Sequence, residues 1–130
     1  MRGLQLIADL HGCAPARPCM TEPEALRRAC LDAVKAAGLA AVRDLFHRFA
    51  PGVADAAAGI TGVVLLAESH VAVHTWPELG AATLDVYVCN FGADNSAKAR
   101  DLLDRLIAAF EPAHVARRTI ERGAATVPAA

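Results

Sequence analysis

The chain has 130 residues, of which 55% are hydrophobic and 5% aromatic, and its formal net charge is −1. This length predicts a single domain over residues 1–130, and the apolar content excludes intrinsic disorder. The near-neutral charge gives no electrostatic signature of nucleic-acid binding, and no apolar run is long enough to cross a membrane. Because the N-terminus lacks a signal-peptide pattern, we expect a cytoplasmic protein. A core of small side chains buries little area per residue, which favours an oligomer.

The first elements predicted along the chain are a strand and a helix. Residues 3–10 alternate between apolar and other side chains, which is typical of a strand. Thr21 is expected to cap the helix that follows, because Glu24 stands three residues later, as in a capping box. Gly38 is expected to end this helix.

The rest of the chain is rich in β-type residues and contains one further helix. Leucines recur at helical spacing over 96–110, and the polar loop 90–95 precedes them. Turn-forming residues separate the apolar runs, so strands are expected at 40–49, 60–67, 71–75, 82–89 and about 113–121. We expect an α+β protein, a two-layer α/β sandwich with helices on one face of an antiparallel sheet, in the order β-α-β-β-β-α-β.

Four cysteines raise the question of disulfides or a metal site. An even number in a short chain permits two disulfides, but thiols of a cytoplasmic protein stay reduced. No two of them have the Cys-x-x-Cys spacing of a zinc site. We therefore expect most of them to be buried, unreactive thiols: Cys13, Cys19, Cys30 and Cys89.

The densest run of chemically active side chains lies at 68–78, which holds two carboxylates, a serine, two histidines and the only tryptophan. A polar strand edge is the simplest interpretation. A serine hydrolase is a second, but the run lacks a Gly-x-Ser-x-Gly motif and Ser69 is expected within a strand. A metal site is a third, because His70 and His74 share one face and a carboxylate from Asp85 or Glu78 could complete the set. That spacing is weak evidence, and no metal is expected.

A more specific interpretation comes from resemblance to a known family. The motifs Glu68-Ser69-His70 and His74-Thr75-Trp76-Pro77-Glu78, followed by Asp85 and Cys89, resemble the prokaryotic S-adenosylmethionine decarboxylase family. The similarity also includes Cys13 and residues 46–49, 62–64 and 121–123, so it covers nearly the whole chain. It implies a two-layer sandwich, in agreement with the predicted elements, and a pyruvoyl-dependent decarboxylase of polyamine biosynthesis.

Members of this family are proenzymes that cut their own chain. The resemblance places the cut between Glu68 and Ser69, which would give a β chain of residues 1–68 and an α chain of residues 69–130. Ser69 would become the pyruvoyl cofactor, an electron sink for decarboxylation of an amino-acid-type substrate. His74 matches the histidine that removes a proton during this processing, and imidazole titrates near neutral pH.

The resemblance assigns four further residues. Thr61 stands where the family usually has a serine hydroxyl that assists processing. Cys89 matches the family's proton donor in the mature enzyme, and a thiol is largely protonated at neutral pH. For the substrate, Phe49 corresponds to an aromatic residue that stacks on adenine and Glu78 to a carboxylate that binds ribose hydroxyls.

Some features depart from the family pattern and leave the substrate open. Gln5 replaces a histidine of many relatives, and residues 79–82 lack tyrosines that relatives often carry. S-adenosylmethionine is the default substrate, with L-ornithine or L-arginine as alternatives on the same scaffold and cofactor. A regulatory relative that never processes is a further alternative. The family also implies a homodimer of processed protomers, with sites near the interface.

Overall fold

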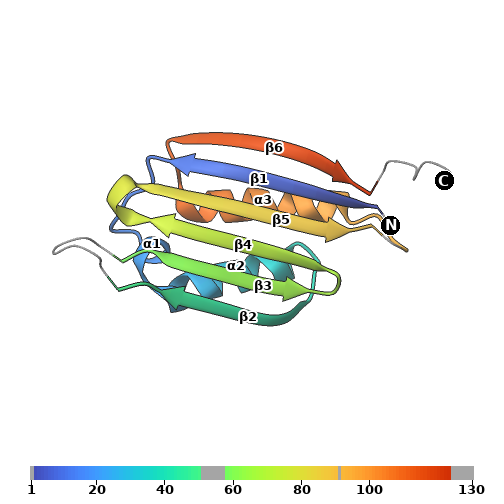
Figure 1. Cartoon of the computed structure of the whole chain (residues 1–130), viewed down its shortest axis with the longest axis horizontal. Helices are drawn as coiled ribbons and strands as arrows, with labels where there is room; N and C mark the ends of the chain where they lie inside the picture. The colour runs from blue at the N-terminus through green and yellow to red at the C-terminus, as the bar shows by residue number, and fades with distance from the viewer. Residues whose placement is uncertain (1, 51–57, 91, 124–130) are drawn as a thin grey trace, which may run out of the picture.

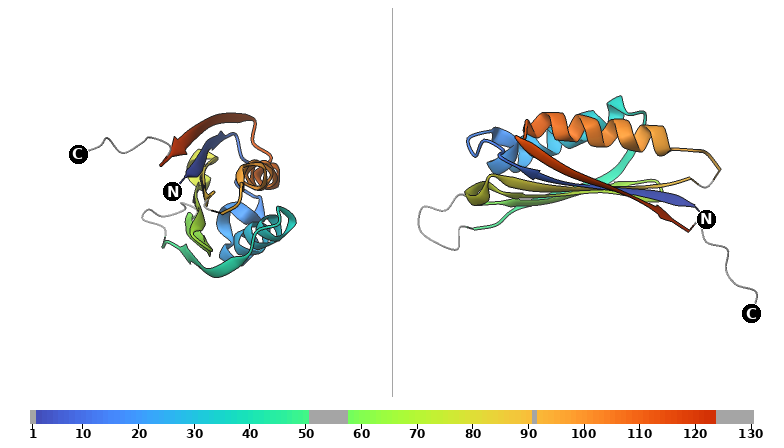
Figure 2. Two further views of the ribbon diagram at one scale, coloured as in Figure 1. Left: turned by 90° about the vertical axis from the view of Figure 1, so that its right-hand side faces the viewer. Right: turned by 90° about the horizontal axis from the view of Figure 1, so that it is seen from above.

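The computed structural model describes residues 2–50, 58–90 and 92–123. It confirms the α+β sandwich: a six-stranded antiparallel sheet has its helices packed on one face (Figure 1 and Figure 2). The sheet order is β2-β3-β4-β5-β1-β6. The strands are β1 (Gly3–His11), β2 (Ala41–Arg48), β3 (Ile60–Leu66), β4 (Ser69–Trp76), β5 (Ala81–Cys89) and β6 (His114–Arg122). The helices are α1 (Pro18–Thr21), α2 (Pro23–Ala36) and α3 (Ser96–Phe110), with a 3-10 turn η1 (Pro77–Leu79).

The expected element order counts one strand too few, since four strands separate α2 from α3, in agreement with the four strand ranges predicted there. The runs on either side of Glu68 are two distinct strands, because Leu66 pairs with Ser69 across a turn of two residues. Ser69 is therefore the first residue of β4, at the start of the strand and not in its middle. Most of the alanine-rich loop 51–59 and the tail after Gly123 lie outside the described residues.

The expected cap at Thr21 is also wrong, because Thr21 ends the short helix α1. Glu22 is the N-cap of α2 and makes no side-chain capping hydrogen bond. The residue before a proline avoids the helical conformation, and Glu22 is extended at φ −111° because Pro23 follows it. Proline is favoured at the first position of a helix, so Pro23 starts α2 there.

The sheet has one buried face and one open face. In β4 the residues that point to the helices are buried, and the residues between them are only partly covered. The same alternation holds in β1, β3 and β5, as the two-residue period of a strand requires. The buried side chains of the sheet pack against α2 and α3. The largest fully buried side chains of these helices include Leu26, Leu102, Leu106 and Phe110. No described helix covers the other side of the sheet, which we call the open face (Figure 2).

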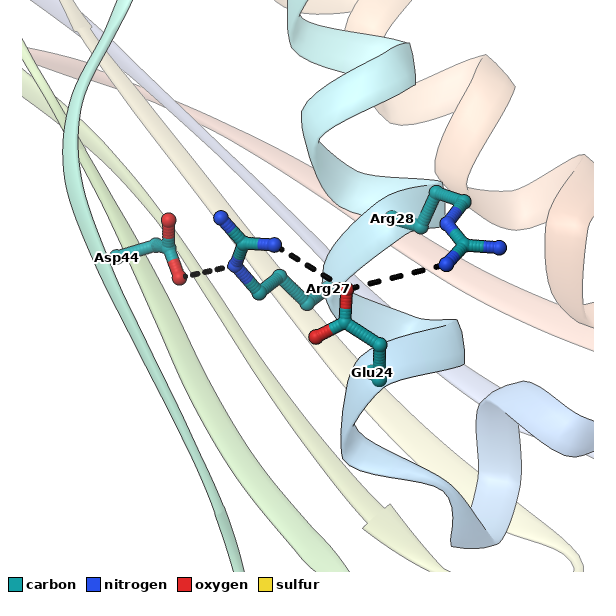
Figure 3. Close-up of polar contacts among 4 residues, drawn as sticks. All are labelled: Glu24, Arg27, Arg28 and Asp44. Atoms are coloured by element: carbon teal, nitrogen blue, oxygen red, sulfur yellow. Dashed lines mark hydrogen bonds and ion pairs between the residues drawn. The ribbon is translucent and has the colours of Figure 1, made fainter.

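Ion pairs attach the helix layer to the sheet edge (Figure 3). The Arg27 side chain of α2 donates to the Asp44 carboxylate of β2 at 2.8 Å and to Glu24 at 3.2 Å. Arg28 adds a longer ion pair to Glu24 at 3.9 Å. These contacts hold the exposed edge strand β2 against the helix that covers it.

Candidate active site

The bond between Glu68 and Ser69 lies in the tight turn that joins β3 to β4. Glu68 has φ +55°, in the left-handed region. A non-glycine residue there costs about 1–2 kcal/mol, because its Cβ approaches the following carbonyl oxygen. The turn has no room to relax, since Leu66 and Ser69 on its two sides are paired. Backbone strain is thus stored next to the peptide bond that the sequence predicts to be cut.

The Ser69 hydroxyl is oriented by the end of a neighbouring strand. The backbone N–H of Cys89 donates to the Ser69 Oγ at 3.0 Å. This contact is possible because His70 pairs with Tyr87, so that β4 begins where β5 ends. A donor at the hydroxyl oxygen stabilises negative charge there, which favours attack by that oxygen. Two predicted site residues, far apart in sequence, are therefore in direct contact.

Cys89 differs from the other cysteines in its surroundings. All four are free and buried, as the sequence predicts. Burial raises the pKa of the Cys30 thiol to about 12 and that of Cys19 to about 11, and it also raises the pKa of Cys13. These three thiols lie in the core under the helices, where they stay protonated. Cys89 instead lies at the end of β5, beside Ser69.

A second pair of predicted residues meets elsewhere on the open face. Thr61 and His74 are direct partners in the β3–β4 ladder, and Thr61 Oγ1 lies 3.1 Å from His74 Nδ1. The neighbouring Thr75 fixes this part of β4, because its hydroxyl donates to the Met20 carbonyl at 2.8 Å. The same hydroxyl accepts the Ile60 N–H at 3.0 Å, which anchors the start of β3. The hydrogen bonds of the Thr75 hydroxyl therefore hold in place the two strand segments that carry Thr61 and His74.

The two predicted substrate-binding residues lie at this same end of the sheet. Phe49 follows β2, is 52% exposed and places its ring edge-on to His47 at 4.7 Å. His47 pairs with Thr61 across the sheet. Glu78 lies in η1, directly after β4. An exposed aromatic ring and an exposed carboxylate thus lie at the same end of the sheet as His74.

The structure does not bring all predicted residues into one cluster. His74 lies five residues after Ser69 in the same strand, a separation of about 16 Å at the rise of a β-strand. We call the group of Glu68, Ser69 and Cys89 the serine end, on the right in Figure 1. The histidine end, on the left, comprises Phe49, Thr61, His74 and Glu78. Within one chain, His74 cannot reach a proton of Ser69.

Polar residues that the metal interpretation singled out have other partners. Gln5 Nε2 donates to both carboxylate oxygens of Asp85, at 3.0 and 3.1 Å. The His70 ring packs beside Tyr87, with ring centroids 5.6 Å apart. Over the described ranges, no group of three or more His, Cys, Asp or Glu side chains is arranged to hold a metal ion.

Sequence reasoning missed two asparagines at the serine end. Asn95 Nδ2 donates to the Cys89 carbonyl at 2.9 Å, and Asn90 Oδ1 accepts the Asn95 N–H at 2.8 Å. The sequence indicated only that a polar loop precedes α3. Asn95, directly before the predicted helix, was the signal that could have indicated them, because asparagine is favoured at that position for its side-chain hydrogen bonds.

Known proteins resemble this chain over almost its full length. A family model described as S-adenosylmethionine decarboxylase matches residues 4–123. The S-adenosylmethionine decarboxylase proenzyme of Hydrogenobaculum sp. is 38% identical over 121 residues, 93% of this chain and 81% of that protein. The proenzyme of the same name from Pyrococcus furiosus is 34% identical over 119 residues, 92% of this chain and 80% of the relative.

Solved structures agree with the sequence comparisons. The crystal structure of the adenosylmethionine decarboxylase from Aquifex aeolicus has a TM-score of 0.81 and 35% identity, covering 98% of this chain and 96% of that one. The crystal structure of an AdoMetDC monomer from Trypanosoma brucei shares the fold, with a TM-score of 0.56 and 12% identity. The match covers 88% of this chain and 44% of that one. None of the described helices has the length and apolar character needed to span a membrane. The match of sequence, fold and motif along the chain shows that it belongs to the S-adenosylmethionine decarboxylase family.

Proposed function

We propose that the chain is a proenzyme that cuts itself between Glu68 and Ser69 and then decarboxylates S-adenosylmethionine. The pyruvoyl group would be formed from Ser69. The observation that carries this proposal is the strained turn at Glu68, next to a serine hydroxyl that accepts the N–H of Cys89. The substrate follows from the relatives, which are named S-adenosylmethionine decarboxylase proenzymes. None of those relatives is named for ornithine or arginine.

In the self-cleavage, the Ser69 hydroxyl attacks the Glu68 carbonyl carbon, and an ester replaces the amide bond. A base then removes the Ser69 Cα proton, the Cβ–O bond breaks, and the Glu68 carboxylate leaves as the end of the β chain. Water replaces the α-nitrogen, which departs as ammonia. Relief of the left-handed conformation at Glu68 favours the first step, because cleavage frees that residue from the turn.

We propose His74 as the base and Thr61 as the residue that orients it. Thr61 Oγ1 contacts Nδ1 of the ring, which leaves Nε2 to exchange a proton. Because His74 and Ser69 of one chain are about 16 Å apart, the base would come from a second copy. The partner subunit's His74 would face Ser69 if two open faces packed together with their β4 strands antiparallel.

The open face has the composition of a surface that a second copy would cover. Large apolar side chains from several strands are exposed on it: Leu45 at 68%, Leu65 at 47%, Ile120 at 46% and Trp76 at 38%. These side chains lie on a face of the sheet that no described helix covers, and exposed apolar residues on such a face favour a contact with another protein. A two-fold dimer would bury it and would complete two equivalent sites at once. We therefore propose that the functional unit is a homodimer of cleaved chains.

In the mature enzyme, the pyruvoyl group supplies the electron sink for loss of carbon dioxide. Cys89 would supply the proton that the substrate carbon receives, since it lies beside the residue that becomes the start of the α chain. Phe49 would stack on the adenine, and Glu78 would accept hydrogen bonds from the ribose hydroxyls. Since both lie at the histidine end, they would bind substrate at the Ser69 of the partner.

Two measurements test the proposal. Intact mass should show the wild-type chain split before Ser69, and Ser69→Ala should remain one chain. Release of carbon dioxide is then compared among S-adenosylmethionine, L-ornithine and L-arginine, with S-adenosylmethionine expected to be decarboxylated. An uncut wild-type chain would overturn the proenzyme assignment. Release from ornithine or arginine alone would overturn the substrate.

A further inference from the structure

The peptide groups on either side of Cys89 are held by two side chains. Its N–H donates to the Ser69 Oγ at 3.0 Å, and its carbonyl accepts from Asn95 Nδ2 at 2.9 Å. Cys89 is the last residue of β5, so the chain beyond it leaves the sheet and needs other contacts to stay fixed. Together with the pairing of Cys89 with Gly3 in the β1–β5 ladder, these two hydrogen bonds fix the backbone from which the thiol projects.

The Asn95 side chain is used for Cys89 and not for the helix that follows. Asn95 occupies the N-cap of α3 but makes no side-chain capping hydrogen bond. The carboxylate of Asp94 instead accepts the free N–H of Ser96 at 2.9 Å. Asparagine at an N-cap usually satisfies the helix N–H groups itself. At the start of α3, Asp94 therefore caps the helix, and Asn95 holds the Cys89 carbonyl.

Asn90 holds Asn95 in position for this contact. Asn90 Oδ1 accepts the Asn95 N–H at 2.8 Å, and Asn90 Nδ2 donates to Ser96 Oγ at 3.0 Å. The Asn90 N–H also donates to the Arg2 carbonyl at 2.8 Å, which ties the loop to the start of β1. We call Asn90 and Asn95 the asparagine clamp. Their amides offer both the donors and the acceptors that this chain of contacts requires.

We propose that the asparagine clamp positions the Cys89 thiol in the mature enzyme, with Asn95 acting directly and Asn90 through it. This inference rests on the proposed function, because the proposed self-cleavage carries the Ser69 oxygen away with the Glu68 carboxylate. The Cys89 N–H then loses the acceptor that it has in the precursor. After cleavage, the contact from Asn95 is the remaining side-chain hydrogen bond to the Cys89 peptide groups among the described residues. The clamp therefore matters more to turnover than to cleavage.

The test compares Asn95→Asp with Asp94→Ala. Asn95→Asp keeps the size of the side chain and its preference for the N-cap, but it lacks the amide donor. Asp94→Ala weakens the same helix start and leaves the contact to Cys89 in place. In the otherwise unchanged enzyme, Asn95→Asp should still be cut at Ser69. Its kcat should fall about tenfold or more with KM changed less than threefold, as expected for a misplaced proton donor.

A second measurement does not depend on activity. Ser69→Ala lacks the hydroxyl, as the mature chain does, so each variant is also made in that background. The rate at which iodoacetamide alkylates Cys89 is followed by peptide mass, with the buried Cys13, Cys19 and Cys30 reporting any general loosening. Asn95→Asp should accelerate alkylation of Cys89 at least fivefold, without a change at the other three. Asp94→Ala should lower the melting temperature and leave the Cys89 rate unchanged.

Two results would overturn the positioning role. One is an unchanged Cys89 alkylation rate in Asn95→Asp. The other is an equal acceleration by Asp94→Ala, which would show that the helix start as a whole is responsible. Failure of the proposed function is recognised separately, since the wild-type chain would then remain uncut or would release no carbon dioxide from S-adenosylmethionine.

Discussion

The two ends of β4 differ in how they prepare their side chains for chemistry. At the serine end, backbone geometry dominates: Glu68 is left-handed, and Ser69 Oγ accepts a peptide N–H. At the histidine end, partly exposed side chains lie on the open face, where His74 contacts Thr61. In the proposed mechanism, the serine end supplies the strained bond and its nucleophile, and the histidine end supplies the groups that exchange a proton and bind the substrate. Under the proposed function, a single chain would carry two half-sites, separated by the length of one strand.

Complementation between two inactive variants tests most directly whether the two ends of β4 act together across two chains. Ser69→Ala and His74→Ala should each remain uncut when expressed alone, because each lacks one half of the site. When the two are expressed together, their heterodimer contains one intact site, formed by Ser69 of one chain and the partner subunit's His74. About half of the His74→Ala chain should then be cut, if the copies pair at random. Intact mass identifies which chain is split.

The result that would contradict this arrangement is cleavage of His74→Ala on its own at the wild-type rate. Absence of cleavage in the mixture, where size-exclusion chromatography shows dimers, would equally remove the shared site. His47→Ala serves as a matched control, because His47 lies on the same face and pairs with Thr61. It should be cut normally.

Replacing the proposed proton donor, Cys89, should separate turnover from cleavage at the serine end. Cys89→Ala retains the backbone N–H that contacts Ser69, so the chain should still be cut. Its kcat should fall by about 10²–10⁴-fold, the usual contribution of a positioned acid. Cys30→Ala is the comparison variant, since that buried thiol lies in the core away from Ser69. Turnover of Cys89→Ala at the wild-type rate would remove its assigned role.

Substitutions for substrate binding test the histidine end with a smaller effect. Glu78→Gln removes a charged acceptor and Phe49→Leu removes an aromatic face, and neither touches the Glu68–Ser69 turn. Each should raise KM for S-adenosylmethionine about tenfold, corresponding to about 1.4 kcal/mol of binding free energy. Cleavage measured by mass should be unchanged. An unaltered KM in both variants would place the nucleoside elsewhere.

Relief of strain at the turn gives the smallest expected effect. Glycine adopts the left-handed conformation freely, so Glu68→Gly should stabilise the uncut chain by about 1 kcal/mol. The melting temperature, measured in the Ser69→Ala background, should therefore rise by a few degrees. Self-cleavage of Glu68→Gly should be slower than that of the wild type, because less strain is released. Faster cleavage would show that the conformation of Glu68 does not promote the reaction.

Much of the fold could be predicted because its signals are local. Alternation of apolar side chains predicted the strands, and leucines at helical spacing predicted α3 with the observed bounds. The error at Thr21 has a local cause too, because Glu22, the residue before Pro23, is extended and becomes the N-cap of α2. Strand spacing alone could also have separated Ser69 from His74, since five residues in one strand span about 16 Å.

The sequence by itself predicted which residues would carry the chemistry, and it determined which residues of each strand share a face, because a strand alternates with a fixed period of two. The tertiary structure decided which of them meet. Ser69 contacts Cys89, and Asn95 reaches the Cys89 carbonyl, through strand register and the packing of α3 near the end of β5. Such contacts join residues six to twenty positions apart, and no local pattern encodes them because they depend on how whole elements pair and pack.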